Sequence, residues 1–87
     1  MPQVQMFATA ICPYCVRARR LLQRKGVAFE EIRIDKDRKQ YAVMVERSHR
    51  TTVPQIFIDG VHVGGYDDMA MLDEAGKLDR LLARRVA

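Results

Sequence analysis

The strongest constraint on the fold is the position of the only two cysteines, Cys12 and Cys15, which lie within one four-residue segment. A disulfide stabilises a protein mainly by closing a long loop of the unfolded chain, and a bridge across two residues closes almost none. In a reducing compartment, paired cysteines serve catalysis or metal binding more often than structure. The pair therefore predicts a chemical role.

The residues around the pair predict a strand before it and a helix after it. Residues 3–9 place Val4, Met6 and Ala8 at alternate positions, which puts them on one side of a strand. Pro13 suits the first position of a helix, because the N–H that proline lacks has no partner there. Apolar side chains then recur at helical spacing, and Gly26 is suited to end the helix. This pattern places Cys12 at a helix start.

The remaining segments are predicted by their apolar spacing and their turn residues. They are a strand over residues 27–34, a helix capped by Asp35 and ending near Ser48, strands over 55–58 and 61–63 joined at Asp59-Gly60, a helix capped by Asp67 or Asp68 and reaching Leu72, and a final helix over 77–85.

This order of elements predicts an α/β fold in a single domain over residues 1–87. The strand–helix–strand unit favours a parallel pair of strands, and the hairpin adds two antiparallel ones. The result is a four-stranded mixed sheet with helices on both faces. A C-x-x-C segment beside such a unit is typical of a thioredoxin-like redox motif.

Cys12 is the predicted nucleophile of thiol–disulfide exchange, in which a thiolate attacks a disulfide sulfur in line. Unpaired backbone N–H groups and the positive end of the helix dipole favour thiolate at a helix start. Cys15 lies about one helical turn further on, so we expect it to reach the same sulfur from a deeper position. It is the predicted resolving thiol. Arg17, Arg19 and Arg20 add to the positive field if they face the sulfur.

A zinc site and an inert buried pair are the alternatives to a catalytic role for the two cysteines. A structural zinc ion needs four ligands, and the remaining candidates, His49 and His62, are thirteen residues apart instead of three to five. A helix start is also an unusual place for inert cysteines. No metal is therefore expected.

The charge pattern and the hydropathy argue against nucleic acid and membranes as partners. Residues 1–50 carry 11 Lys and Arg against 5 Asp and Glu, but aromatic residues do not alternate with the basic ones, so no nucleic acid is expected. No apolar run approaches the roughly 20 residues that cross a bilayer, so no membrane is expected. The first residues lack a signal-peptide pattern, and the cytoplasm is the predicted location.

Three motifs in register resemble the glutaredoxin family, in particular its small bacterial dithiol members. They correspond to the family's dithiol active site, its cis-proline loop and its Gly-Gly-x-Asp/Ser-Asp element. In this chain they are Cys12-Pro13-Tyr14-Cys15, Thr52-Val53-Pro54 and Gly64-Gly65-Tyr66-Asp67-Asp68. The resemblance covers nearly the whole chain.

The resemblance implies an enzyme that reduces protein disulfides and glutathione mixed disulfides, with glutathione as its reducing co-substrate. It implies a monomer whose partners are glutathione and disulfide-containing or glutathionylated proteins, with ribonucleotide reductase among the candidates. One alternative is a glutaredoxin-like electron donor fed by thioredoxin reductase, which Pro13-Tyr14 and the Gly-Gly-x-Asp-Asp element disfavour. Another is a dimer that holds an iron–sulfur cluster with glutathione, which Pro13 also disfavours.

A glutathione site is implied at the matching positions. Val53, next to a cis-Pro54, is expected to pair with the cysteinyl backbone of glutathione like an added strand. The start of the third helix is expected to hold the γ-glutamyl carboxylate, and Asp67 or Asp68 its ammonium group, although both aspartates also suit N-capping. The implied contacts are Tyr14, Thr52, Val53, Pro54, Gly65, Tyr66, Asp67 and Asp68.

One position departs from the family pattern. The family often has a lysine three residues before the nucleophile, associated with the glycyl carboxylate of glutathione, and this chain has Thr9 there. Another cation or water must then meet that carboxylate. The candidate cations are Arg38, Lys39, Arg47 and Arg50.

Overall fold

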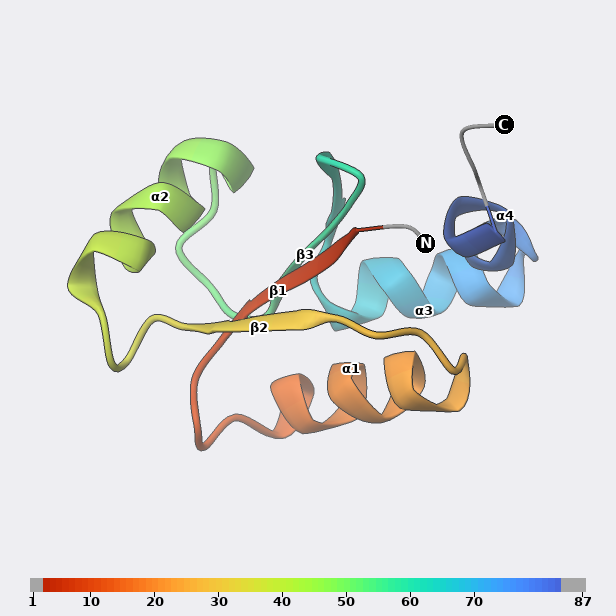
Figure 1. The fold of residues 1–87 in the computed structure, drawn as a ribbon, viewed down its shortest axis with the longest axis horizontal. Helices are drawn as coiled ribbons and strands as arrows, with labels where there is room; N and C mark the ends of the chain where they lie inside the picture. Colours follow the sequence, from red (N-terminus) through yellow and green to blue (C-terminus); the bar gives the residue numbers. More distant parts are fainter. Residues whose placement is uncertain (1–2, 84–87) are drawn as a thin grey trace.

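The structure is a computed structural model, and it describes residues 3–83 of the 87-residue chain. Four strands and four helices follow one another in the predicted order, including the final helix (Figure 1). Their bounds are β1 Val4–Ala8, α1 Pro13–Arg24, β2 Glu30–Arg33, α2 Arg38–Ser48, β3 Gln55–Ile58, β4 Val61–Gly64, α3 Tyr66–Glu74 and α4 Lys77–Ala83.

The strands form one mixed sheet in the order β2-β1-β3-β4, which confirms the predicted α/β sheet. β1 and β2 pair in parallel, with α1 as the connection between them. β3 runs antiparallel to both β1 and β4, and the Asp59-Gly60 turn joins β3 to β4 as predicted. Within residues 3–83, no helix has the length and hydrophobicity needed to cross a membrane.

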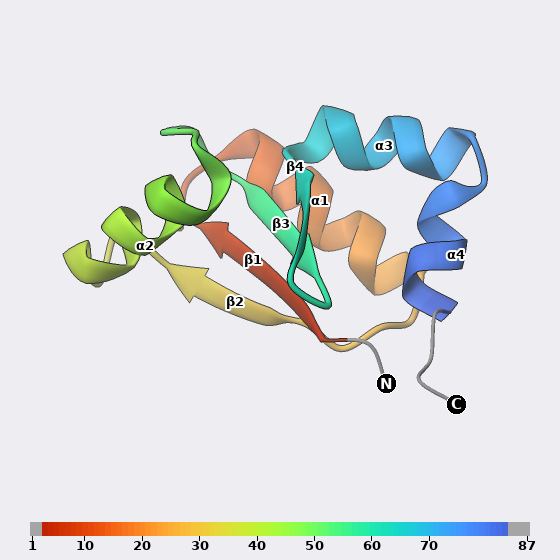
Figure 2. The ribbon, with the colours of Figure 1, turned by 90° about the horizontal axis from the view of Figure 1, so that it is seen from above.

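Helices cover both faces of the sheet. Successive β1 side chains point to opposite faces, so each face presents apolar side chains for a helix to cover. Met6 and Ala8 pack in a cluster with side chains of α1, α3 and α4, whereas Phe7 packs with Phe57 and with Met44 of α2. In Figure 1, α1 accordingly lies below the strands and α2 above them, and Figure 2 shows α3 beside α1. This arrangement presents the start of α1 at the edge where β1 ends.

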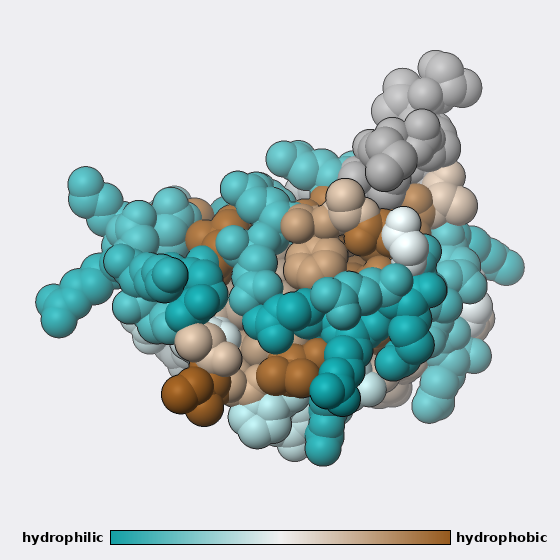
Figure 3. Space-filling view, turned by 60° about the horizontal axis from the view of Figure 1, so that its bottom comes forward, coloured by the Kyte–Doolittle hydropathy of each residue, from teal (hydrophilic) through white to brown (hydrophobic). Residues whose placement is uncertain are grey.

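α1 is amphipathic, which explains how a short chain both buries a core and keeps the outer side of this helix hydrated. Ala18, Leu21 and Leu22 are buried against the sheet. Figure 3 turns the side that carries α1 toward the viewer and shows hydrophilic side chains over most of it, with a few separate hydrophobic groups. The arginines after the cysteines therefore lie mostly on a solvated helix face.

The predicted cap of the second helix was wrong by two residues. Asp37 is the N-cap of α2, and its carboxylate accepts a hydrogen bond from Lys39 N at 3.0 Å. Asp35 lies in the turn after β2, where its carboxylate accepts hydrogen bonds from Ala10 N at 3.2 Å and from the Arg33 guanidinium. Asp35 therefore fixes the loop that leads into Cys12.

The predicted cap of the third helix was also wrong, since Gly65 is the N-cap of α3. Asp68 occupies the third helical position and reaches back to accept a hydrogen bond from Gly65 N at 2.9 Å. The aspartate thus completes a capping box without being the cap itself. Some predicted bounds also differ from the structure. α3 continues past Leu72 to Glu74, and β2 covers Glu30–Arg33 and not residues 27–34. The predicted end of α4 at residue 85 lies outside the described residues.

Candidate functional site

Cys12 is the N-cap of α1, as the position of Pro13 predicted. Its backbone is extended, and Pro13 follows as the first helical residue. The Cys12 sulfur accepts a hydrogen bond from Cys15 N at 3.3 Å and lies 3.9 Å from the Val53 carbonyl oxygen. An N–H group and the positive end of the α1 dipole therefore both face the sulfur, and both stabilise negative charge on it.

Cys15 is completely buried beneath α1, within the cluster that packs on the sheet. Burial, together with its hydrogen bond to Cys12, raises the pKa of the Cys15 thiol to about 12. Backbone hydrogen bonding at Thr9 and the charge of Arg19 act in the opposite direction. Both cysteines are free thiols in this structure, and the buried one is protonated at neutral pH.

The loop before β3 faces the Cys12 sulfur. The Val53–Pro54 peptide bond is cis, which confirms the prediction. Gln55, at the start of β3, is only 1 % exposed and donates hydrogen bonds from Nε2 to Thr52 O at 3.0 Å and to Thr52 Oγ1 at 3.3 Å. A buried side chain therefore supports the exposed edge of this loop from within.

The start of α3 is held by the Asp68 carboxylate. Asp68 Oδ2 accepts hydrogen bonds from Arg50 Nη1 at 2.8 Å and from Gly65 N at 2.9 Å. The Arg50 guanidinium, followed by the Gly65 N–H, holds the pKa of Asp68 below its usual range, so the carboxylate is charged at neutral pH. Gly64 has φ +115°, and a Cβ there would lie 2.8 Å from Asp68 Cγ, so this approach requires glycine.

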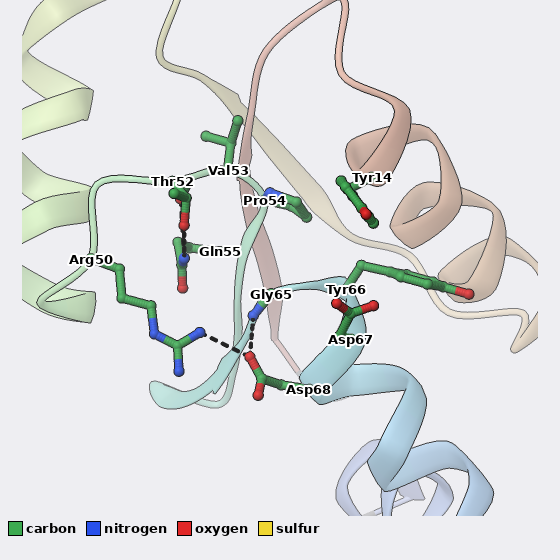
Figure 4. Close-up of a pocket in the computed structure, with 10 residues that line it drawn as sticks. All are labelled: Tyr14, Arg50, Thr52, Val53, Pro54, Gln55, Gly65, Tyr66, Asp67 and Asp68. Carbon is green, nitrogen blue, oxygen red and sulfur yellow. Dashed lines mark hydrogen bonds and ion pairs between the residues drawn. The ribbon is translucent and has the colours of Figure 1, made fainter.

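The loop before β3 and the start of α3 line an open pocket of about 320 Å³ near Cys12 (Figure 4). Cys12 does not itself line the pocket, but its sulfur lies 3.9 Å from the carbonyl oxygen of Val53, which does. In Figure 4 Arg50 reaches across the pocket toward Asp68, while Tyr14 and Tyr66 lie on the opposite side. The lining residues comprise all eight implied contacts and two further residues: Tyr14, Arg50, Thr52, Val53, Pro54, Gln55, Gly65, Tyr66, Asp67 and Asp68.

Gln55 was not among the predicted site residues. A polar residue at the buried start of an apolar strand was the available signal, because buried amides require hydrogen-bond partners. Arg50 was one of four candidate cations, and of those four it alone lines the pocket. Arg47 instead lies over the Phe57 ring, 4.1 Å from its centroid. Arg38 and Lys39 belong to the first turn of α2.

The arginines after the cysteines point in different directions. Arg17 lies over the Tyr14 ring, 5.3 Å from its centroid, and Tyr14 itself is 48 % exposed beside Tyr66. Arg19 forms a two-pronged ion pair with Glu31 of β2, at 2.6 and 2.8 Å. Glu31 therefore compensates part of the Arg19 charge, whereas Arg17 contacts Tyr14, a residue that lines the pocket.

The histidines do not form a metal site with the cysteines. His49 ends α2, and His62 Nε2 lies 2.7 Å from Gln55 Oε1. Among the described residues, no three or more His, Cys, Asp or Glu side chains gather as metal ligands.

Comparison with known proteins gives consistent results. A model of the Glutaredoxin family matches residues 4–63. "Glutaredoxin" of Pseudomonas aeruginosa is 53 % identical over 83 residues, covering 95 % of this chain and 99 % of the relative. "Glutaredoxin 3" of Escherichia coli K12 is 51 % identical over 82 residues, covering 94 % and 99 %.

Solved structures agree with the sequence relatives. The solution structure of glutaredoxin from Brucella melitensis has a TM-score of 0.82 and 48 % identity, covering 97 % of this chain and 94 % of that one. The crystal structure of a buckwheat glutaredoxin–glutathione complex has a TM-score of 0.86 and 28 % identity, covering 93 % and 76 %.

Proposed function

The chain belongs to the glutaredoxin family and is a dithiol thiol–disulfide oxidoreductase, and on this premise we propose that glutathione is its reductant. The proposed substrates are protein disulfides and glutathione mixed disulfides. The observation that carries this proposal is the Cys12 sulfur at the start of α1, beside a 320 Å³ pocket walled by a loop edge and a helix N-terminus.

In the first proposed step, the Cys12 thiolate attacks the glutathione sulfur of a mixed disulfide. The protein thiolate leaves and takes up a proton, and a disulfide forms between Cys12 and glutathione. The Cys15 backbone nitrogen, 3.3 Å from the Cys12 sulfur, donates a hydrogen bond that stabilises the negative charge on the attacking thiolate. A second glutathione thiolate then attacks this disulfide, which yields oxidised glutathione and restores the Cys12 thiolate.

Protein disulfides follow a second proposed route that uses both cysteines. Cys12 attacks one sulfur of the substrate and forms a mixed disulfide with it. Cys15 then loses its proton and attacks the Cys12 sulfur, which releases the reduced substrate and leaves a Cys12–Cys15 disulfide. Two glutathione molecules reduce that disulfide and emerge as oxidised glutathione.

Glutathione is proposed to lie along the pocket, with its cysteinyl backbone against Val53. Its γ-glutamyl carboxylate meets the N–H groups at the start of α3, where the helix dipole favours an anion. Within residues 3–83 the exposed Asp67 carboxylate has no hydrogen-bond or ion-pair partner, so we assign the ammonium group to it, with Asp68 adding negative charge nearby. Arg50 is the proposed cation for a glutathione carboxylate in place of the missing lysine.

We further propose that residues 1–87 act as one domain and as a monomer in the cytoplasm, where glutathione supplies electrons. Ribonucleotide reductase is one candidate among the protein substrates. The alternatives, reduction by thioredoxin reductase and a cluster-holding dimer, are favoured by no feature of the described residues.

The proposed function is tested by an assay on a glutathionylated peptide with glutathione, glutathione reductase and NADPH. The expected result is NADPH oxidation that depends on the protein and saturates with the mixed disulfide. Replacing glutathione and its reductase by thioredoxin reductase is expected to give a much lower rate. Turnover no faster than the uncatalysed exchange would reject the proposal.

Asp68→Asn is expected to raise the KM for the mixed disulfide by about three- to tenfold, because the pocket loses a carboxylate that Arg50 and the Gly65 N–H keep charged. The kcat is expected to change little, since Asp68 does not touch the reacting sulfurs. Steady-state kinetics measure both. Glu74→Gln, which removes the same charge from the other end of α3, is the matched control, and an equal KM rise there would contradict the assignment.

A further inference from the structure

A chain of polar side chains, with the buried Gln55 at its centre, links β4 to the substrate-facing loop. His62 of β4 lies opposite Phe57 in the β3–β4 pairing, and its Nε2 is 2.7 Å from Gln55 Oε1. The other end of the Gln55 amide contacts the carbonyl oxygen and the hydroxyl of Thr52. Thr52 precedes Val53, whose carbonyl faces the Cys12 sulfur at 3.9 Å. The chain therefore runs from His62 to the edge of the active site.

The chemistry of the partners fixes the proton positions along this chain. The Thr52 carbonyl oxygen is only an acceptor, so the amide nitrogen of Gln55 must face it. The amide oxygen of Gln55 then faces His62 and is also only an acceptor. His62 must therefore carry a proton on Nε2, and in its neutral form Nδ1 is bare.

The surroundings of His62 keep its ring in this orientation. The imidazole packs on the Phe57 ring, with centroids 4.9 Å apart and an angle of 32° between the planes. Burial, and to a lesser extent the charge of Arg50, lowers the pKa of His62 below its usual range, while Asp68 acts in the opposite direction. Neutral His62 is thus the relevant species at neutral pH.

We propose that His62 is a positioning residue that, through Gln55, holds the Thr52–Val53 edge in the arrangement that receives the substrate peptide. The inference rests on the proposed function, since it concerns the same pocket. Gln55 is 1 % exposed, so its amide depends on protein partners for its hydrogen bonds. Without the His62 donor, the amide oxygen of Gln55 is left buried without a hydrogen-bond partner. The amide is then held less firmly against flipping, and in the flipped orientation its oxygen faces the Thr52 carbonyl oxygen and the hydrogen bond to the loop is lost.

His62→Phe keeps an aromatic ring against Phe57 and removes only the donor. The KM for the glutathionylated peptide is expected to rise about fivefold, which corresponds to the loss of one neutral hydrogen bond. The kcat is expected to stay within about twofold of wild type. His62→Gln carries an N–H of similar reach and is expected to restore most of the KM. Val61→Thr, an exposed neighbour on the same strand, is the control and should leave KM unchanged.

A double-mutant cycle separates positioning from a general structural role. In a Gln55→Met background the amide is absent, so adding His62→Phe is expected to change KM by less than about twofold. A full fivefold effect in that background would show that His62 does not act through Gln55, and would overturn the proposal.

Nitrogen NMR of the wild-type protein supplies a readout that needs no turnover. Above the pKa of His62, the imidazole is expected to show a protonated Nε2 and a bare Nδ1. A proton on Nδ1 would overturn the proposal even if the enzyme is fully active. Absence of glutathione-dependent turnover with the expected tautomer would instead reject the proposed function, so the two failures are distinguishable.

Discussion

Cys12→Ser is expected to reduce turnover of every disulfide substrate by at least about a thousandfold, to the rate of the uncatalysed exchange. A serine oxygen forms no disulfide with a substrate sulfur, so neither proposed route has a first step. The measurement is the glutathione-coupled assay, run on both a glutathionylated peptide and a protein disulfide.

The fold is expected to survive this replacement, which makes the loss of activity interpretable. Cys12 is the N-cap of α1, and serine is among the preferred N-cap residues, with an oxygen able to accept the hydrogen bond from Cys15 N. The thermal midpoint of Cys12→Ser should therefore equal or exceed that of the wild type. Activity above a few per cent of wild type would mean that Cys15, the only other thiol, is the nucleophile.

The fold was predictable because local signals agreed with one another over most of the chain. Pro13 predicted the start of α1, and Asp59-Gly60 predicted the β3–β4 hairpin. The caps of α2 and α3 were wrong because several aspartates met the same local rule. For α2, a long-range hydrogen bond from Ala10 N occupies the Asp35 carboxylate, which leaves Asp37 as the cap. For α3, Gly65 is the cap, and Asp68 accepts the hydrogen bond from Gly65 N from the third helical position.

The site was predictable where its residues are consecutive, and less so where strand pairing assembles it. The cysteine pair, the loop at Val53 and the start of α3 are each contiguous motifs. Gln55 and His62 are polar residues whose meaning appears only when β3 and β4 pair and bring their side chains to 2.7 Å. Arg50 likewise became distinct from the other candidate cations only through its place in the pocket.

Cys15→Ser is expected to separate the two routes. Turnover of the glutathionylated peptide should stay within about threefold of wild type, because that route needs only Cys12 and glutathione. Reduction of a protein disulfide should fall by about a hundredfold, because a neighbouring thiol attacks with an effective concentration that free glutathione does not reach. The same coupled assay measures both rates, and Cys15→Ala controls for the buried hydroxyl.

The high pKa of Cys15 explains why it resolves and does not initiate. Burial is the first cause of that rise, but contact with Cys12 contributes, so the rise diminishes once Cys12 is bound in a mixed disulfide. The charge of Arg19, which lowers the pKa of Cys15, remains. Burial still raises the pKa of Cys15 at that step, but the Cys15 thiolate forms more easily there than in the free enzyme. In Cys15→Ser this step is missing, and intact-mass spectrometry should find the substrate held on Cys12. Loss of both activities in that variant would reverse the two roles.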